Sequence, residues 1–304
     1  MTLTPEYLSL VGVYSAMAIY GLAFCSFAWD LARRSALVPV LSSGREELAQ
    51  ASGHKGSNVF ERIGKTLFTF GWGLHLLSVV FRGIAGGRVP WANMFEFGLT
   101  ATMLIVAVYL ASLFWRDLGF LGAFVSGFTL LALGVVTVNF YVEVVPLPPA
   151  LQSAWLVIHV FVASLATAFF ALGAALSGLQ LTSSFFERKR PTLPRLLSSL
   201  PSSTVLESLA YRLNVVGFVM WSFTLVAGAI WAEGAWGRYW GWDVKEVWTF
   251  IIWVIFAGYI HARVTRGWRG SRAAWLSLAG FGAVIFNYTV VNIFFTGLHS
   301  YSGL

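Results

Sequence analysis

Tryptophan is concentrated in one short segment, WAEGAWGRYWGWDVKEVW, which runs from Trp231 to Trp248. Five of the 14 tryptophans of the chain fall within these 18 residues. A long apolar run precedes the segment and another follows it, so we expect the segment at the water-facing end of two membrane spans. Indole rings suit the membrane–water boundary and can lie against a large planar ligand. An ordinary interfacial belt of tryptophans is the alternative reading.

Two histidines are candidates for binding a metal beside this segment. His159 follows Ala-Leu-Gln-Ser-Ala-Trp near the start of one apolar run, and His299 lies just past the end of the last run, in Gly-Leu-His-Ser-Tyr. Neutral imidazole is a good axial ligand for haem iron. Two histidines at the depth of a tryptophan-rich surface are what a bis-imidazole iron porphyrin needs. Two unrelated interfacial histidines that make ordinary hydrogen bonds are the alternative.

The composition predicts the elements that must position these residues. The chain is 58% hydrophobic and only 11% charged, with a mean hydropathy of +0.74, which excludes a soluble globular protein. A membrane-spanning helix needs about 20 mostly apolar residues. Eight runs qualify: Tyr7–Trp29, Thr66–Phe81, Phe95–Trp115, Leu118–Phe140, Ala154–Leu181, Leu213–Trp231, Val247–His261 and Ala273–Leu298. We therefore expect an all-α polytopic membrane protein, with residues 1–304 forming a single integral membrane domain.

The basic residues predict the orientation of the spans. The stretches that follow the first, third, fifth and seventh spans hold 16 of the 20 Lys and Arg residues, and the other side keeps Arg82, Arg88, Arg238 and Lys245. The positive-inside rule then places both termini and the tryptophan-rich segment outside the cytoplasm. Basic loops that face an anionic inner leaflet account for the net charge of +7, so nucleic-acid binding is not needed to explain it.

The remaining segments carry little chemistry of their own. The first apolar run lacks a preceding basic residue and a small-residue cleavage site, so we expect a retained span and not a signal peptide. The two long cytoplasmic segments, 32–65 and 182–212, are polar, serine-rich and basic, and are expected to be connectors. Cys25 is the single cysteine and lies in the first span, so thiol–disulfide exchange within the chain is excluded.

Three further histidines lie elsewhere. His261 ends the seventh span, directly before a basic run, and His54 is expected to be a solvated loop residue. His75 lies ten residues beyond Lys65, which places it about 15 Å inside the inner boundary at about 1.5 Å per residue. Ionisable groups at that depth are rare and often functional. A neutral histidine that hydrogen-bonds a neighbouring helix is the alternative.

His75 and His261 are poorly placed to share one iron. His261 lies only about 3 Å from the inner boundary, so the two residues differ in depth by about 12 Å. Opposed imidazoles on one iron are separated by only about 4 Å, because metal–nitrogen bonds are about 2 Å long. We therefore expect any inner site formed by His261 to take its second ligand from another chain.

The pattern of residues resembles a known family. Trp236-Gly-x-x-Trp240-x-Trp242-Asp243 is similar to the "WWD" signature of haem-handling proteins, and the wider chain resembles the CcsA (ResC) family of system II cytochrome c biogenesis. The chain departs from this family at Val244, where proline is usual. The resemblance extends to Pro90-x-x-Asn93-x-x-Glu96, Ala150-Leu-Gln-Ser-x-Trp155 leading to His159, Trp231-Ala-Glu-x-Ala-Trp236, Lys245-Glu246-x-Trp248, Tyr259-x-His261-x-Arg263 and Val291-Asn292 through Gly297-Leu-His-Ser-Tyr301.

The resemblance implies that the chain transports and presents haem b and takes part in a cytochrome c synthase. His159 and His299 match the family's outer haem ligands, and His261 matches a transmembrane histidine whose partner comes from the CcsB (ResB) subunit. His75 has no assured counterpart. Further implied partners are an apocytochrome c with a CxxCH segment and a thiol-reducing membrane protein. The implied location is the plasma membrane of a bacterium, or the thylakoid membrane for a plastid protein.

Roles for the other residues follow from this reading. Trp236, Trp240 and Trp242 are expected to cover the porphyrin, and Asp243 to hold the loop through backbone hydrogen bonds rather than to act as an acid. Arg238 or Lys245 could pair with the propionates, although a solvated face suits both. The catalytic residues stay unassigned. The alternatives are delivery of haem to a chaperone, a secondary transporter, for which no internal repeat is found, and a purely structural subunit.

Overall fold

The computed structural model describes residues 3–41, 59–116, 118–146, 152–189 and 200–299. Within these ranges the chain is helical and forms no strand. The helices are α1 (Pro5–Leu41), α3 (Val59–Gly86), α4 (Met94–Ser112), the short 3₁₀ helix η1 (Gly119–Leu121), α5 (Gly122–Asn139), α6 (Ala154–Lys189), α8 (Ser203–Trp236), α9 (Val244–Thr265), α10 (Ser271–Tyr288) and α11 (Val290–Phe294).

Eight of the described helical segments are long and apolar enough to cross a membrane, which confirms the predicted all-α fold and number of spans. Several helices extend beyond the apolar runs. α3 begins at Val59 and α8 at Ser203, within segments that we expected to be connectors. These extensions are stabilised by ion pairs between helices, because Arg34 of α1 pairs with Glu61 of α3 and Arg263 of α9 pairs with Glu207 of α8.

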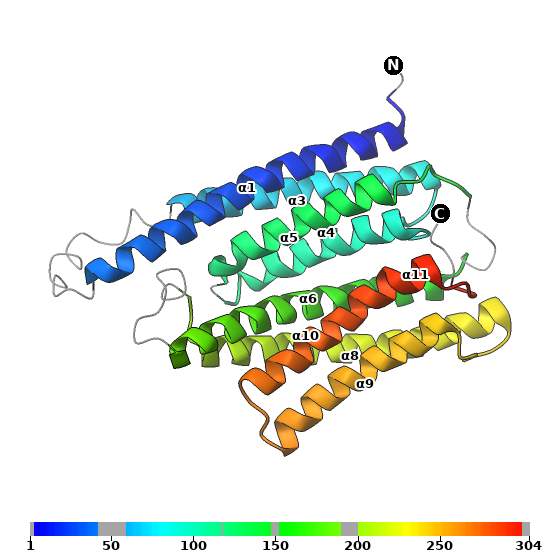
Figure 1. The fold of residues 1–304 in the computed structure, drawn as a ribbon. Coiled ribbons are helices and arrows are strands. Elements are labelled where there is room, and N and C mark those ends of the chain that lie inside the picture. Colours follow the sequence, from blue (N-terminus) through cyan, green and yellow to red (C-terminus); the bar gives the residue numbers. More distant parts are fainter. Residues whose placement is uncertain (1–2, 42–58, 117, 147–151, 190–199, 300–304) are drawn as a thin grey trace.

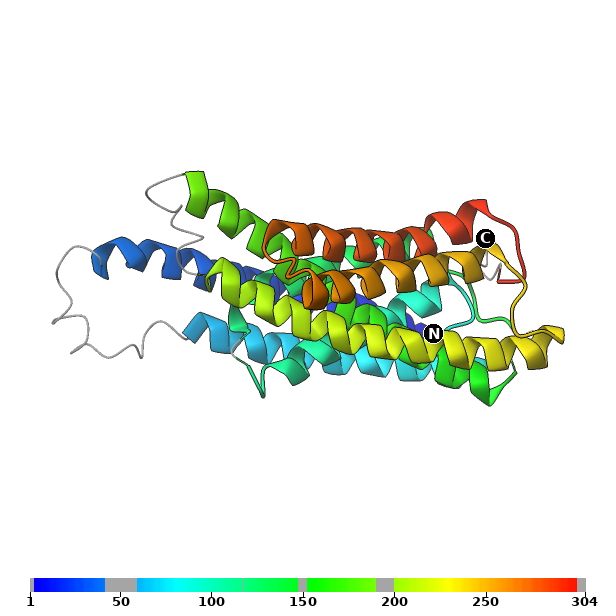
Figure 2. The same ribbon diagram turned by 90° about the horizontal axis from the view of Figure 1, so that it is seen from below.

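The helices form an elongated bundle with two distinguishable ends (Figures 1 and 2). The start of α1, the α8–α9 connection and α11 lie together at one end. Arg33, Arg34, Arg212, Arg263 and Arg266 belong to helix ends at the opposite end. The tryptophan-rich segment and these five arginines therefore lie at opposite ends of the bundle. Which end faces the cytoplasm stays a prediction from the basic residues.

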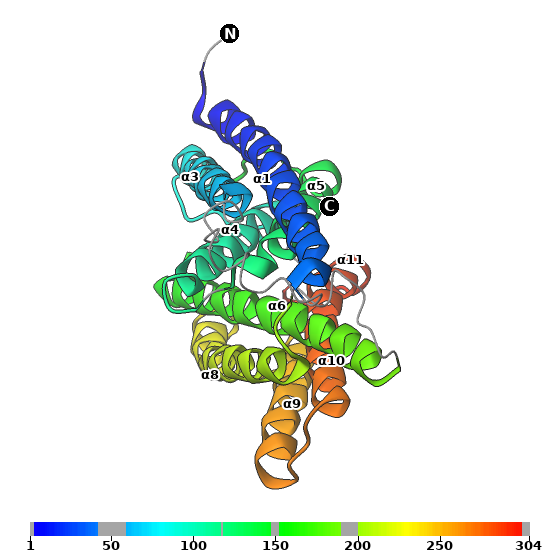
Figure 3. The same cartoon turned by 90° about the vertical axis from the view of Figure 1, so that its left-hand side faces the viewer.

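The bundle consists of two groups of helices joined through α4 and α6. α1 packs along α3 and α5 in one group, while α6 packs along α8 and α10 packs on α9 in the other. Figure 3 shows this arrangement end-on, with α4 and α6 between the two groups. α4 contacts both α5 and α6 and is the most buried of the spans. The buried faces of α4 and α6 therefore line the interior where the two groups meet.

Candidate functional site

A cavity of about 280 Å³ lies where the two groups of helices meet, at the tryptophan-bearing end. Helices α4, α5, α6, α8, α9 and α10 all contribute to its walls, which are mainly apolar. Its size is close to the lower limit of about 300 Å³ that is usual for small-molecule sites. Five of the residues predicted from sequence line it, namely His159, His299, Trp231, Trp240 and Lys245.

His159 projects from the start of α6 and is held by α8. Its Nδ1 lies 2.9 Å from the backbone oxygen of Thr224. Because a carbonyl oxygen can only accept, Nδ1 carries the proton and Nε2 keeps its lone pair. Gly228 leaves room for the ring, since a Cβ at this position would lie 2.7 Å from Cε1 of His159. The imidazole is thus fixed in the tautomer that ligates a metal through Nε2.

His299 follows α11 and is oriented in the same way by a different acceptor. Its Nδ1 lies 2.8 Å from Oδ2 of Asp243, so Nδ1–H donates to the carboxylate and Nε2 keeps its lone pair. Burial lowers the pKa of His299 below its usual range, while the hydrogen bond to Asp243 acts in the opposite direction. The ring is therefore expected to be neutral at pH 7, as a metal ligand must be.

Trp231 lies against both imidazoles and is buried. Its ring is nearly parallel to that of His159, with centroids 6.1 Å apart, and is tilted against that of His299 at 5.5 Å. Since both rings contact one indole, the two separations limit the distance between the imidazole centroids to 11.6 Å at most. Two histidines that are 140 positions apart in the sequence therefore meet at one cavity.

The other tryptophans of the segment do not form a single flat surface. Trp236 packs edge-on against both His299 and Trp231, with centroid distances of 4.7 Å in each case. Trp240 lines the cavity and contacts Trp242 at 5.8 Å with perpendicular rings. Trp242 has a positive φ of 60° and is 72% exposed, and it is not among the residues that line the cavity. Trp236 therefore supports a histidine, while Trp240 faces the cavity.

Asp243 and Glu246 form a capping box at the start of α9. Asp243 accepts from the backbone of Lys245 and, through its other oxygen, from the backbone of Leu298. Glu246 accepts from the backbones of Gly241 and Asp243 at 2.7 and 3.1 Å. Sequence reasoning gave no role to Glu246, although the Asp-x-x-Glu spacing is the usual signal for such a cap. Val244 is the first residue of α9, a position that suits proline without requiring it.

The two basic residues near the site differ in their surroundings. The ammonium of Lys245 donates to the backbone oxygen of Asn287, at 3.2 Å, and to the side chain of Asn292. Arg238 is partly exposed, lies 3.9 Å from the carboxylate of Glu246, and is not among the residues that line the cavity. Of these two candidates for pairing with an acidic ligand group, Lys245 is therefore the one that reaches the cavity.

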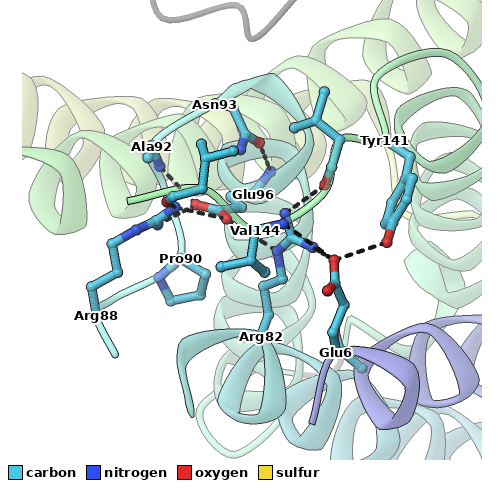
Figure 4. Close-up of polar contacts among 12 residues, drawn as sticks. Glu6, Arg82, Arg88, Pro90, Ala92, Asn93, Glu96, Tyr141 and Val144 are labelled. Atoms are coloured by element: carbon cyan, nitrogen blue, oxygen red, sulfur yellow. Dashed lines mark hydrogen bonds and ion pairs between the residues drawn. The ribbon is translucent and has the colours of Figure 1, made fainter. Parts of the chain in front are cut away.

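A buried network of charges holds the connection between α3 and α4, which forms part of the cavity wall (Figure 4). Arg82 is 1% exposed and donates to Glu96 at 3.0 Å and to Glu6 at 3.2 Å. Arg88 donates to both oxygens of Glu96, at 2.5 and 3.1 Å, and Asn93 caps α4. Two guanidinium groups thus neutralise two carboxylates. The sequence indicated Asn93 and Glu96 but not that Arg82 and Arg88 pair with Glu96.

His75 and His261 lie away from this cavity. His75 is fully buried in the core, where its Nε2 donates to the backbone oxygen of Leu99 at 2.9 Å and its Nδ1 accepts from Tyr20 at 3.2 Å. Both ring nitrogens are thus engaged within the protein. His261 is exposed near the opposite end of α9. His54 lies outside the described residues.

Comparisons with known proteins agree on one family. The family described as Cytochrome C assembly protein matches residues 91–299. The cytochrome c biogenesis protein CcsA of Guillardia theta is 35% identical over 272 residues, covering 81% of this chain and 89% of that protein. CcsA of Chlamydomonas reinhardtii is 33% identical over 281 residues, covering 86% and 77%.

A solved structure shares the fold. The cytochrome c haem lyase CcmF superposes with a TM-score of 0.64 at 16% identity. The match covers 95% of this chain but only 47% of CcmF, so the chain spans about half the length of that protein. At this identity the likeness concerns the arrangement of the helices alone.

Proposed function

Because the chain belongs to the CcsA family of cytochrome c assembly proteins, and so is a membrane protein that acts in cytochrome c biogenesis, we propose that it binds haem b between His159 and His299. In this proposal it presents the haem for covalent attachment to an apocytochrome c. The attachment requires a CcsB-like membrane subunit and an apocytochrome whose thiols a further membrane protein keeps reduced.

This proposal rests on one observation. His159 and His299 line the same cavity, and each donates its Nδ1 proton to a fixed acceptor, the oxygen of Thr224 and the carboxylate of Asp243. Metal-ligating histidines usually donate their second nitrogen to a carbonyl or carboxylate in this way. The donor set therefore fits haem iron, which accepts two neutral imidazoles.

The surrounding residues support the same reading. Trp231 and Trp236 hold the His299 ring by edge contacts, and Trp240 offers an indole to a planar ligand. The Nζ of Lys245 reaches the cavity, where it can donate a hydrogen bond to a haem propionate. Asp243 orients His299 and keeps its ring from rotating. The vinyl groups of haem supply the chemistry of attachment, since the two thiols of a CxxCH segment add across them.

His261 belongs to a separate part of this proposal. Its exposed position on α9, at the end opposite the cavity, leaves it accessible to a neighbouring subunit. We propose that it binds haem together with a histidine of the CcsB-like subunit. This role requires no contact between His261 and the other described histidines.

The test is the optical spectrum of the full-length protein purified with its partner subunit. We expect a low-spin spectrum typical of bis-histidine haem, and its loss in a His159→Ala/His299→Ala double variant. The matched control is His261→Ala, which leaves the outer pair intact and should keep its share of the signal. An unchanged spectrum in the double variant would refute the assignment of these two ligands.

A further inference from the structure

A second cavity, of about 250 Å³, continues the first one towards the opposite end of the bundle. Ile105, Phe128 and Phe281 line both cavities, so these residues mark the junction. Along α6 the two cavities together extend from Leu156 to Ala175. At about 1.5 Å per residue this is about 28 Å, close to the thickness of about 30 Å of the hydrocarbon core of a bilayer.

The lining of the second cavity is entirely apolar among the described residues. Its floor consists of Ala171, Leu172 and Ala174 of α6, which are buried. Phe124 and Phe128 of α5, at its edge, are 37% and 38% exposed. A helix surface exposed in this part of a membrane protein faces lipid. The cavity is therefore a furrow that opens sideways towards the hydrocarbon.

The arrangement of the helices explains the opening. α5 packs on α1 and α4, whereas α10 packs on α6 and α9. In the end-on view of Figure 3, α5 and α10 lie on the same flank of the molecule. The rings of Phe128 and Phe281 meet across the space between these two helices, with centroids 6.4 Å apart and planes tilted by 58°. We call the second cavity, together with this junction, the α5–α10 furrow.

We propose that the α5–α10 furrow is the lateral entrance through which haem passes from the lipid to the outer histidines, an inference that rests on the proposed function. The furrow leads directly to His159 and His299, the groups in the cavity suited to iron. Apart from the histidines, the charged residues of the combined lining within the described part of the chain are Lys245 and Glu246, in the cavity that holds the histidines. Glu246 already accepts from the backbones of Gly241 and Asp243, so Lys245 is the group left to donate to a carboxylate at the edge of an apolar ring.

His261 does not lie on this route, because it is not among the residues that line either cavity. A lipid acyl chain would also fit the apolar walls, but it carries no group for the two imidazoles. Phe128 and Phe281 act as the gate of this entrance. A flat ring between two others needs about 7 Å or more between their planes, since carbon atoms approach to about 3.5 Å. One Phe side chain must therefore rotate before haem can pass.

The experiment measures how fast haem enters the outer site from a membrane. Full-length protein is reconstituted into phosphatidylcholine vesicles and mixed with vesicles that contain haem, and the growth of the bis-histidine spectrum is followed. Leu278→Trp fills the furrow with an indole, and we expect loading to slow by about tenfold, equivalent to about 1.4 kcal/mol of added barrier. The matched control, Leu22→Trp, places an indole at an exposed position of α1 and should load like the parent protein.

A second variant tests the gate, and a titration in detergent checks that the Leu278→Trp protein is folded. Phe281→Ala removes one ring of the gate and should speed loading. Haem added to detergent-solubilised Leu278→Trp protein should give the parent spectrum at the end of the titration, which shows that the site has folded. Equal loading rates for Leu278→Trp and Leu22→Trp would overturn the lateral route while leaving the proposed function intact. A parent protein that never acquires the spectrum would overturn the proposed function and the route together.

Discussion

His299 donates a hydrogen bond of 2.8 Å to Asp243, and this contact joins the end of the last helix to the tryptophan-rich connection. The same carboxylate caps α9 and accepts from the backbone of Leu298. One side chain therefore sets both the start of a helix and the orientation of an imidazole. A substitution at Asp243 can therefore affect both the cap of α9 and the orientation of His299.

Replacing Asp243 with Asn separates the two roles. Asparagine is as good a helix cap as aspartate, so we expect little change in the melting temperature. The His299 ring loses a charged acceptor, however, and becomes a weaker ligand. We expect haem affinity to fall by about 10-fold or more, as is usual when the carboxylate partner of a ligating histidine is removed. Haem titration followed by absorbance measures this change.

Glu233→Gln is the control for the Asp243 variant, because Glu233 is an exposed acid at the end of α8 and loses the same charge. Its haem affinity should equal that of the parent. If Asp243→Asn also bound haem with the parent affinity, His299 would not depend on this carboxylate and the proposed orienting role would be wrong.

Gly228→Ala should displace His159 without changing any polar group. The added Cβ would lie 2.7 Å from Cε1 of the imidazole, closer than carbon atoms approach in proteins. We expect the ring to leave its position beside Thr224 and the bis-histidine spectrum to be lost or converted to a high-spin form. Absorbance spectra of the purified variant with added haem test this expectation.

The matched control for this substitution is Gly234→Ala, on the same helix. A Cβ at Gly234 meets nothing within 4 Å, so only the helix propensity changes. Alanine is favoured over glycine inside a helix by about 1 kcal/mol, and the control should therefore be at least as stable as the parent. Equal spectra for the two variants would show that close packing at Gly228 does not position His159.

Hydropathy and charge alone predict the number of spans and the side of the bundle on which the tryptophans lie. The predicted helix ends were less accurate, since α3 and α8 start earlier than their apolar runs. A run of hydrophobic residues cannot indicate that Glu61 or Glu207 will pair with an arginine of another helix. Such pairs depend on which helices are neighbours.

The same limit applies to the site. His159 and His299 can be placed at one depth from the sequence, and the structure brings them to one cavity, whereas their role as ligands stays a prediction. Gly228 leaves room for the His159 ring, which belongs to another helix. The sequence around Gly228 does not indicate this contact. The pairing of Glu96 with Arg82 and Arg88 could not be predicted either, because the sequence identifies these arginines only as basic residues near the membrane boundary.

Glu96→Gln should destabilise the folded protein strongly. Glu96 is 1% exposed and is the shared partner of Arg82 and Arg88, so its neutralisation leaves buried guanidinium groups without full compensation. Removing one member of a buried ion pair costs about 3–5 kcal/mol. We expect a marked fall in the thermal midpoint in detergent. Glu143→Gln, at an exposed position nearby, should leave the midpoint unchanged; equal midpoints would mean that the network contributes little.

The orientation of the bundle can be tested by labelling single cysteines. In a Cys25→Ala background, Tyr239→Cys places a thiol at a 63% exposed position of the α8–α9 connection, and Arg269→Cys places one in the exposed α9–α10 connection at the other end. The positive-inside rule predicts that Tyr239 lies outside and Arg269 in the cytoplasm. A membrane-impermeant maleimide should therefore label the first variant in right-side-out vesicles and the second only after permeabilisation. The reverse pattern would place the histidine cavity on the cytoplasmic side, where an apocytochrome outside the membrane could not reach it.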